Sequence, residues 1–136
     1  FVSSLASMFP MPLKATYAAS KRFLLDFALS LRQELQDQDV NVLALCPGGL
    51  PTTREALRGI AAQGFWGDAT TNRLEEVAHN TIERALCGKG IYVPGALNRM
   101  LSILGKMVPR SWVAAIVYWR WSKAQRRWMQ PEGNVG

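Results

Sequence analysis

Tyr17 and Lys21 are four residues apart in a stretch with helical periodicity, so their side chains share one face of a helix. A free phenol has a pKa near ~10, and a neighbouring ammonium stabilises the phenolate and lowers that pKa. The spacing therefore predicts a phenol that could exchange protons near neutral pH. Solvated helix surfaces often carry the same pair, so the surrounding motifs must decide between the two interpretations.

Two further motifs frame this pair. Ser4 ends a short apolar segment thirteen residues before Tyr17, with Ser3 and Ser7 as alternatives for a polar role there. Pro47 and Gly48 follow the apolar, β-branched stretch 40–46, which is typical of a buried parallel strand. Ligands of open α/β sheets bind at the carboxyl ends of the strands, so we expect the Pro47 loop to belong to a site, although it could be only a turn.

The elements that must position these residues alternate between strand and helix. Residues 1–4 are predicted to end a buried strand, and a capping box formed by Asn72 and Glu75 is predicted to begin a helix. Phe23 and Phe27 are expected on the buried face of the first long helix. The remaining predictions are helices 15–36, 54–62, 72–87, 97–107 and 109–129, strands 40–46 and 90–95, and an aromatic loop at 64–68.

Composition narrows the class of protein. Hydrophobic residues make up 49% of the 136, enough for a core, and the net charge is +6. Cys46 and Cys87 are far apart without a Cys-x-x-Cys pair, which favours reduced thiols in a cytoplasmic protein and no metal site. Cys46 is expected to pack in the core, and His79, the single histidine, to lie at or near the surface.

The charge excess lies in the C-terminal residues. Residues 1–94 hold nine Lys or Arg and nine Asp or Glu, whereas residues 95–136 hold seven Lys or Arg and one Glu. Aromatic and basic residues alternate in 109–129, a composition that suits a peripheral membrane surface. The alternative is that Trp112, Ile116 and Trp119 pack on the domain or on a partner. Nucleic-acid binding is the least favoured interpretation and is not expected. The uncharged run between Arg110 and Arg120 is too short to span a bilayer.

Together these motifs resemble the short-chain dehydrogenase/reductase family over about residues 1–95. The residues that carry the resemblance are Val2-Ser3-Ser4, Tyr17-Ala18-Ala19-Ser20-Lys21, and Pro47-Gly48 with Thr52. The resemblance implies an α/β fold, a Rossmann-like doubly wound parallel sheet present as its C-terminal part, with an appended helical tail at 96–136. The family's glycine-rich dinucleotide motif has no match here, so we expect the C-terminal portion of an enzyme, inactive by itself.

By this resemblance Tyr17 would be the general acid or base that exchanges a proton with the substrate oxygen. Ser4 would orient that oxygen. Lys21 would stabilise the Tyr17 phenolate and bind the nicotinamide ribose. The implied function is an NAD(P)-dependent oxidoreductase that transfers a hydride between the nicotinamide and a small, lipophilic carbonyl or alcohol.

The same resemblance implies a nicotinamide-binding loop and a substrate lid. The loop comprises Pro47, Gly48, Leu50 and Thr52, and residues 54–68 would cover the substrate. Phe65 and Trp66 could be lid residues, or they could only anchor the loop by aromatic burial. The choice between NAD and NADP, the reaction direction and association with a second copy are left open. The alternative function is a non-catalytic Rossmann-like binding protein that docks on a membrane or partner through residues 109–129.

Overall fold

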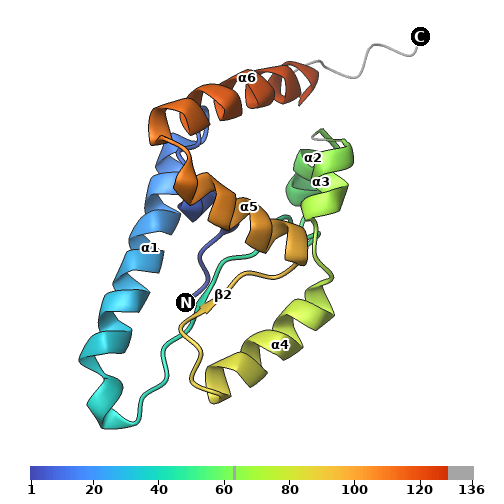
Figure 1. Cartoon of the computed structure of the whole chain (residues 1–136). Helices are drawn as coiled ribbons and strands as arrows, with labels where there is room; N and C mark the ends of the chain where they lie inside the picture. The colour runs from blue at the N-terminus through green and yellow to red at the C-terminus, as the bar shows by residue number, and fades with distance from the viewer. Residues whose placement is uncertain (63, 129–136) are drawn as a thin grey trace.

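The computed structural model describes residues 1–62 and 64–128, and helices dominate it. Figure 1 shows their order along the chain. The helices are α1 (Ala15–Glu34), α2 (Arg54–Ala62), α3 (Phe65–Thr70), α4 (Leu74–Leu86), α5 (Ala96–Met107) and α6 (Arg110–Trp128), with short 3₁₀ helices at Leu5–Met8 and Gln36–Gln38. The strands are β1 (Ala44–Leu45) and β2 (Ile91–Tyr92).

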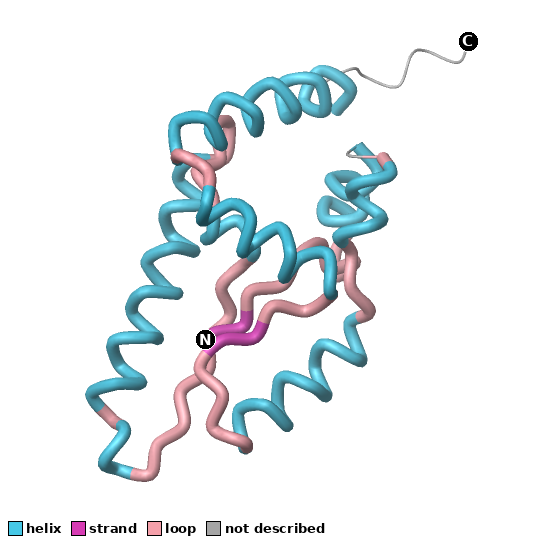
Figure 2. Tube along the Cα trace, in the orientation of Figure 1, coloured by secondary structure: helices cyan, strands magenta, loops and turns pink. Residues whose placement is uncertain are grey.

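β1 and β2 pair in parallel at the centre of the fold (Figure 2), with Ala44 opposite Ile91. The first residues of the chain extend this arrangement, because Val2 forms a parallel bridge to Leu45 and the Ser3 amide donates to the Leu45 carbonyl at 2.8 Å. β1 therefore lies between the N-terminal segment and β2. The chain is α/β, with parallel strands connected by helices.

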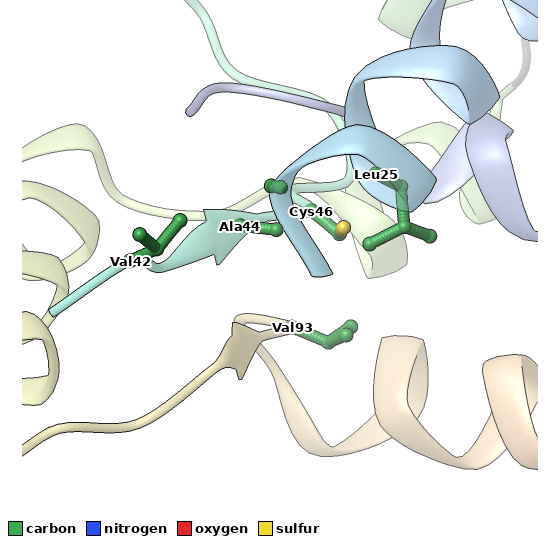
Figure 3. Close-up of a cluster of buried hydrophobic side chains, with 6 residues drawn as sticks. Leu25, Val42, Ala44, Cys46 and Val93 are labelled. Carbon is green, nitrogen blue, oxygen red and sulfur yellow. The ribbon is translucent and has the colours of Figure 1, made fainter. Parts of the chain in front are cut away.

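The side chains of β1 and its flanks alternate between two buried clusters on opposite faces. Figure 3 shows the first cluster, which packs against α1. It comprises Leu25, Ala28, Val42, Ala44, Cys46 and Val93. The second comprises Leu43, Leu45, Val77 and Tyr92, and includes a residue of α4. Helices α1 and α4 thus cover opposite faces of the strands (Figure 1).

Several sequence predictions are confirmed. The helix predicted at 15–36 is α1, the helix predicted at 54–62 is α2, and Cys46 is fully buried in the core. His79 lies on the surface, 3.3 Å from the Glu83 carboxylate. Both cysteines are free thiols.

Other predictions of local structure are wrong. The aromatic loop expected at 64–68 begins the helix α3, with Gly64 at a φ of 59° in front of it. Asn72 does not cap α4, because its Oδ1 accepts a hydrogen bond from Asn98 instead. The segments predicted as strands 40–46 and 90–95 contribute only two paired residues each to β1 and β2.

Two surface corrections concern the N-terminal segment and α1. Phe23 and Phe27 are exposed and stack on each other, with ring centroids 6.0 Å apart. Phe1 and Val2 are exposed as well, so the N-terminal segment is paired on one side but is not the buried strand end that we predicted. Among residues 1–4, Ser3 is the buried one.

The C-terminal helices α5 and α6 follow the predicted ranges closely, with Pro109 immediately before α6. Trp112 and Trp119 are about two-thirds exposed. None of the described helices combines the length and the apolar character needed to cross a membrane. The side chains of Lys123, Arg126, Arg127 and Trp128, and the predicted helix end at residue 129, lie outside the described residues.

Candidate active site

A cavity of about 560 Å³ lies beside the start of α1, and segments distant in sequence line it. The volume is within the ~300–1,000 Å³ usual for small-molecule sites. The described lining residues are Ser4, Leu5, Ala6, Phe9, Met11, Lys14, Tyr17, Gly48, Gly49, Ile60, Gly67, Thr70, Leu101, Leu104, Gly105, Val108, Val113, Ile116, Val117, Arg120 and Trp121. Residues from five helices (α1, α2, α3, α5 and α6), the N-terminal segment and the Gly48 loop therefore line one cavity.

Ser4 lines the cavity as the residue that caps the 3₁₀ helix Leu5–Met8. Its Oγ accepts a hydrogen bond from the Ala6 amide at 3.1 Å. A hydroxyl has one donor and two acceptor positions, so the Ser4 hydroxyl can still donate to a ligand oxygen.

The alternatives Ser3 and Ser7 are buried and use their hydroxyls inside the fold. The Ser3 Oγ donates to the Lys21 carbonyl at 2.7 Å, and the Ser7 Oγ donates to the Ser4 carbonyl at 2.7 Å. Both hydrogen bonds fix backbone next to the proposed site. Of the three serines, Ser4 is the one that lines the cavity.

Tyr17 and Lys21 lie on one face of α1, as predicted. The Lys21 Nζ is 5.8 Å from the centroid of the Tyr17 ring and donates to the Val2 carbonyl at 3.1 Å. The ammonium is thus held between the N-terminal segment and the phenol, within the ~6 Å of a cation–π contact. Tyr17 lines the cavity and is 47% exposed, which leaves its ring accessible to a ligand.

The loop after β1 reaches the cavity through Gly48 and Gly49. A Cβ built on Gly48 would stand 2.2 Å from the Thr70 carbonyl oxygen, so only glycine fits there without displacement. The Asn72 amide donates to the Gly49 carbonyl at 2.9 Å, which ties the loop to the segment after α3. The backbone of this loop is therefore fixed and presents no side chain to the cavity.

The cavity brings together Ser4, Tyr17 and Gly48 from three separate motifs. The other predicted site residues lie around it. Lys21 contacts Tyr17, and Pro47 is buried, with its carbonyl accepting from the Leu5 amide at 2.7 Å. Leu50 packs against the cluster that contains Val77, and Thr52 is exposed. The side chain of Trp66, predicted as a lid residue, lies outside the described part of the chain. The predicted lid contributes Ile60 and Gly67 to the cavity lining.

Sequence reasoning missed two cations in the cavity, Lys14 and Arg120. Burial lowers the pKa of the Lys14 ammonium and of the Arg120 guanidinium below their ordinary values. Lys14 precedes Tyr17 by three residues, a spacing that already placed both near one helix face. No comparable signal pointed to Arg120, because its contribution depends on how α6 folds back over the N-terminal part of the chain.

In a comparison with known protein families, residues 1–59 match the family model described as short chain dehydrogenase. A Drosophila melanogaster protein described as "Dehydrogenase/reductase SDR family protein 7-like" is 37% identical over 73 residues, which cover 52% of this chain and 22% of that protein. The chain thus spans only about a fifth of this relative. No solved structure matches it.

Residues 1–59 are thus similar to the short-chain dehydrogenase/reductase family that the motifs predicted. The family-model match contains Ser4, Tyr17, Lys21 and the Pro47 loop, and ends within α2.

Proposed function

We propose that this chain is the C-terminal part of a Rossmann-like, doubly wound NAD(P)-dependent oxidoreductase that interconverts a carbonyl and an alcohol. The observation that supports it is the shared cavity of Ser4 and Tyr17, with the Lys21 ammonium 5.8 Å from the Tyr17 ring. The parallel strands and the match to the dehydrogenase family support the same function. Residues 1–95 would complete the dehydrogenase domain, and residues 96–136 would be appended to it.

In this function Tyr17 transfers a proton between its hydroxyl and the substrate oxygen. Ser4 donates a hydrogen bond to that oxygen and holds it near the phenol, and the positive charge of Lys21 favours the phenolate that remains after proton donation. An apolar lining limits water around the reacting groups. These residues supply acid–base chemistry and orientation.

The residues present fit the nicotinamide end of a dinucleotide, because two glycines without side chains, Gly48 and Gly49, border the cavity. NAD or NADP would supply the hydride when bound. Pro47, Leu50 and Thr52 would hold the loop against the ring and carboxamide, and Lys21 would contact the ribose. The remainder of the dinucleotide would bind to an N-terminal half.

The experiment that tests this function compares Tyr17→Phe with Tyr118→Phe in the intact enzyme. Tyr118 is an exposed tyrosine of α6 that does not belong to the described cavity lining. We expect Tyr17→Phe to lower kcat about 10²- to 10⁴-fold, the usual contribution of general acid–base catalysis, with little loss of cofactor affinity. Wild-type turnover by Tyr17→Phe would refute the assignment.

The second candidate function is docking on an anionic membrane surface by a non-catalytic protein. Trp112, Ile116 and Trp119 are exposed at positions i, i+4 and i+7 of α6, and Arg110 is exposed at its start. Aromatic and basic side chains together suit the lipid headgroup region. This docking would place the protein peripherally on a membrane from the cytoplasm.

A further inference from the structure

The cavity combines an apolar wall with positive charge. Its side chains are mostly aliphatic or aromatic, and the charged residues among the described lining are Lys14 and Arg120. Neither Asp nor Glu occurs in that lining. A neutral lipophilic substrate would need only the apolar wall.

Lys14 is held where its charge faces the ligand space. It is the last residue before α1, and its Nζ lies 4.4 Å from the centroid of the Trp121 ring. Trp121 also lines the cavity and is the neighbour of Arg120 in α6. The contact therefore brings the Lys14 ammonium to the part of α6 that supplies the second cation.

The Lys14 charge is only partly compensated within the fold. None of the ion pairs of the described residues includes Lys14, and its ammonium is half-buried against an aromatic ring. A cation–π contact is worth much less than a charge-assisted hydrogen bond to a carboxylate. The half-buried Lys14 ammonium at an apolar cavity creates a positive potential that favours an anion, and Arg120 lines the same cavity.

We infer that the cavity binds an amphipathic anion, an apolar molecule with one carboxylate, whose charged group lies between Lys14 and Arg120 and whose chain lies against α5 and α6. The inference rests on the proposed function, because it names the substrate class of the same site. It also explains why the C-terminal helices contribute to the site. They supply both the apolar wall and the second cation.

The reacting carbon of such a substrate would lie a short distance from its carboxylate. Lys14 immediately precedes α1, three residues before Tyr17, and both residues line the cavity. An anion bound at Lys14 would therefore have the adjoining part of its chain in the cavity that Tyr17 also lines. An oxo acid or hydroxy acid with an aliphatic chain meets these conditions.

The test measures binding of three ten-carbon probes to the full 136-residue chain by titration calorimetry at pH 7. The probes are decanoate, decan-1-ol and decyltrimethylammonium, which share the chain length and differ in charge. The variants are Lys14→Met, Arg120→Met and the conservative Lys14→Arg, with Lys89→Met as a control at an exposed lysine outside the described cavity lining. Binding needs no cofactor, so the result is independent of the redox function.

We expect the wild-type chain to bind decanoate at least 10-fold more tightly than decan-1-ol, and decyltrimethylammonium most weakly. Lys14→Met and Arg120→Met should each weaken decanoate binding about 10- to 100-fold, as for the loss of a charge-assisted hydrogen bond, while decan-1-ol binding stays the same. Lys14→Arg should retain decanoate binding, and Lys89→Met should change neither. Equal affinities of the wild-type chain for decanoate and decan-1-ol, or equal losses for both probes in both Met variants, would overturn the inference.

Discussion

The Asn98 amide nitrogen lies so close to Gly48 that a Cβ built on Gly48 would stand 2.8 Å from it. Asn98 is almost fully buried, and its Nδ2 lies within hydrogen-bonding distance of three acceptors, the Pro94 carbonyl at 2.9 Å and the Thr70 carbonyl and Asn72 Oδ1 at 3.1 Å. The loops that follow β1 and β2 thus meet at one amide. The position of Gly48 in the cavity lining depends on this packing.

We therefore predict that Gly48→Ala destabilises the fold. The added methyl would also stand 2.2 Å from the Thr70 carbonyl oxygen, and overpacking of this kind costs about 1–3 kcal/mol. Gly59→Ala is the matched control, because nothing lies within 4 Å of a Cβ built there and alanine favours the α2 helix. Urea unfolding should show a lower midpoint for Gly48→Ala and an unchanged or higher one for Gly59→Ala. Equal midpoints would contradict the packing described for Gly48.

A second prediction compares two arginines of α1. The Arg32 guanidinium donates to the Gly88 carbonyl at 2.8 Å and to the Val42 carbonyl at 3.3 Å. These hydrogen bonds connect α1 to the turn after α4 and to the segment before β1. Arg22 forms an exposed ion pair with Asp26 at 2.8 Å. We expect Arg32→Met to lower the free energy of unfolding by about 1–3 kcal/mol, and Arg22→Met by less than about 0.5 kcal/mol. Urea unfolding of the two variants checks this, and similar losses would show that the Arg32 hydrogen bonds add nothing.

Local sequence patterns predicted the elements that local interactions determine. α1 and α2 follow from the periodicity of apolar residues and from the prolines and polar turns that bound them. The Tyr17 and Lys21 pair follows from helical spacing alone. Asn72 shows the limit of this reasoning, since its partner Asn98 lies 26 residues away and takes the Oδ1 that a capping box would use.

The cavity was less predictable than the motifs. Ser4, Tyr17 and Gly48 could be grouped because each follows or accompanies a recognisable element. The contributions of Leu101, Leu104 and the residues of α6 depend on contacts between segments about a hundred residues apart, for which spacing gives no information. Phe23 and Phe27 match a buried helical face by periodicity, yet the described residues do not cover them.

The buried Cys46 thiol gives a pH-dependent prediction. Burial raises the pKa of Cys46 above its ordinary value of 9.0, and hydrogen bonds from nearby serines oppose this in part. As pH rises past 9, the unfolded chain releases this proton first, so it binds fewer protons than the folded chain and stability falls. The stabilisation that the protonated Cys46 thiol contributes to the folded state is fully present below pH 9 and is lost as pH rises through the pKa of the folded state.

In urea unfolding between pH 7.5 and pH 10, the free energy of unfolding should therefore fall more steeply with rising pH for the wild-type chain than for Cys46→Ala. Cys87→Ala, which changes an exposed cysteine, should keep the wild-type dependence. The comparison of slopes separates the titration from any general destabilisation by the smaller side chain. Parallel curves for wild type and Cys46→Ala would contradict the prediction.

The exposed aromatic residues beside the N-terminal segment predict self-association. Phe1 and Phe27 are in edge-to-face contact with centroids 5.5 Å apart, and Phe23 stacks on Phe27 next to a segment that is paired on one side only. Exposed apolar patches and open strand edges favour contacts between chains. We expect a concentration-dependent rise in mass by sedimentation equilibrium, reduced in Phe23→Ser with Phe27→Ser. The control Phe65→Ser, at an exposed phenylalanine of α3, should associate like wild type.

Membrane docking by α6 predicts selective binding to anionic vesicles. Trp112 and Trp119 are 68% and 64% exposed. Their rings and the Arg110 side chain suit the lipid headgroup region, so replacement of the two tryptophans by serine should abolish docking. Co-sedimentation with vesicles containing phosphatidylserine should recover the wild-type chain, and recovery should fall at high salt, where exposed charges are screened. The double variant Trp112→Ser with Trp119→Ser should stay in the supernatant, whereas Phe65→Ser should sediment like wild type. Because both tryptophans lie outside the described cavity lining, decanoate binding by the double variant should be unchanged. Equal sedimentation of wild type and double variant would eliminate membrane docking through α6, and would leave the exposed ring surface to a protein partner.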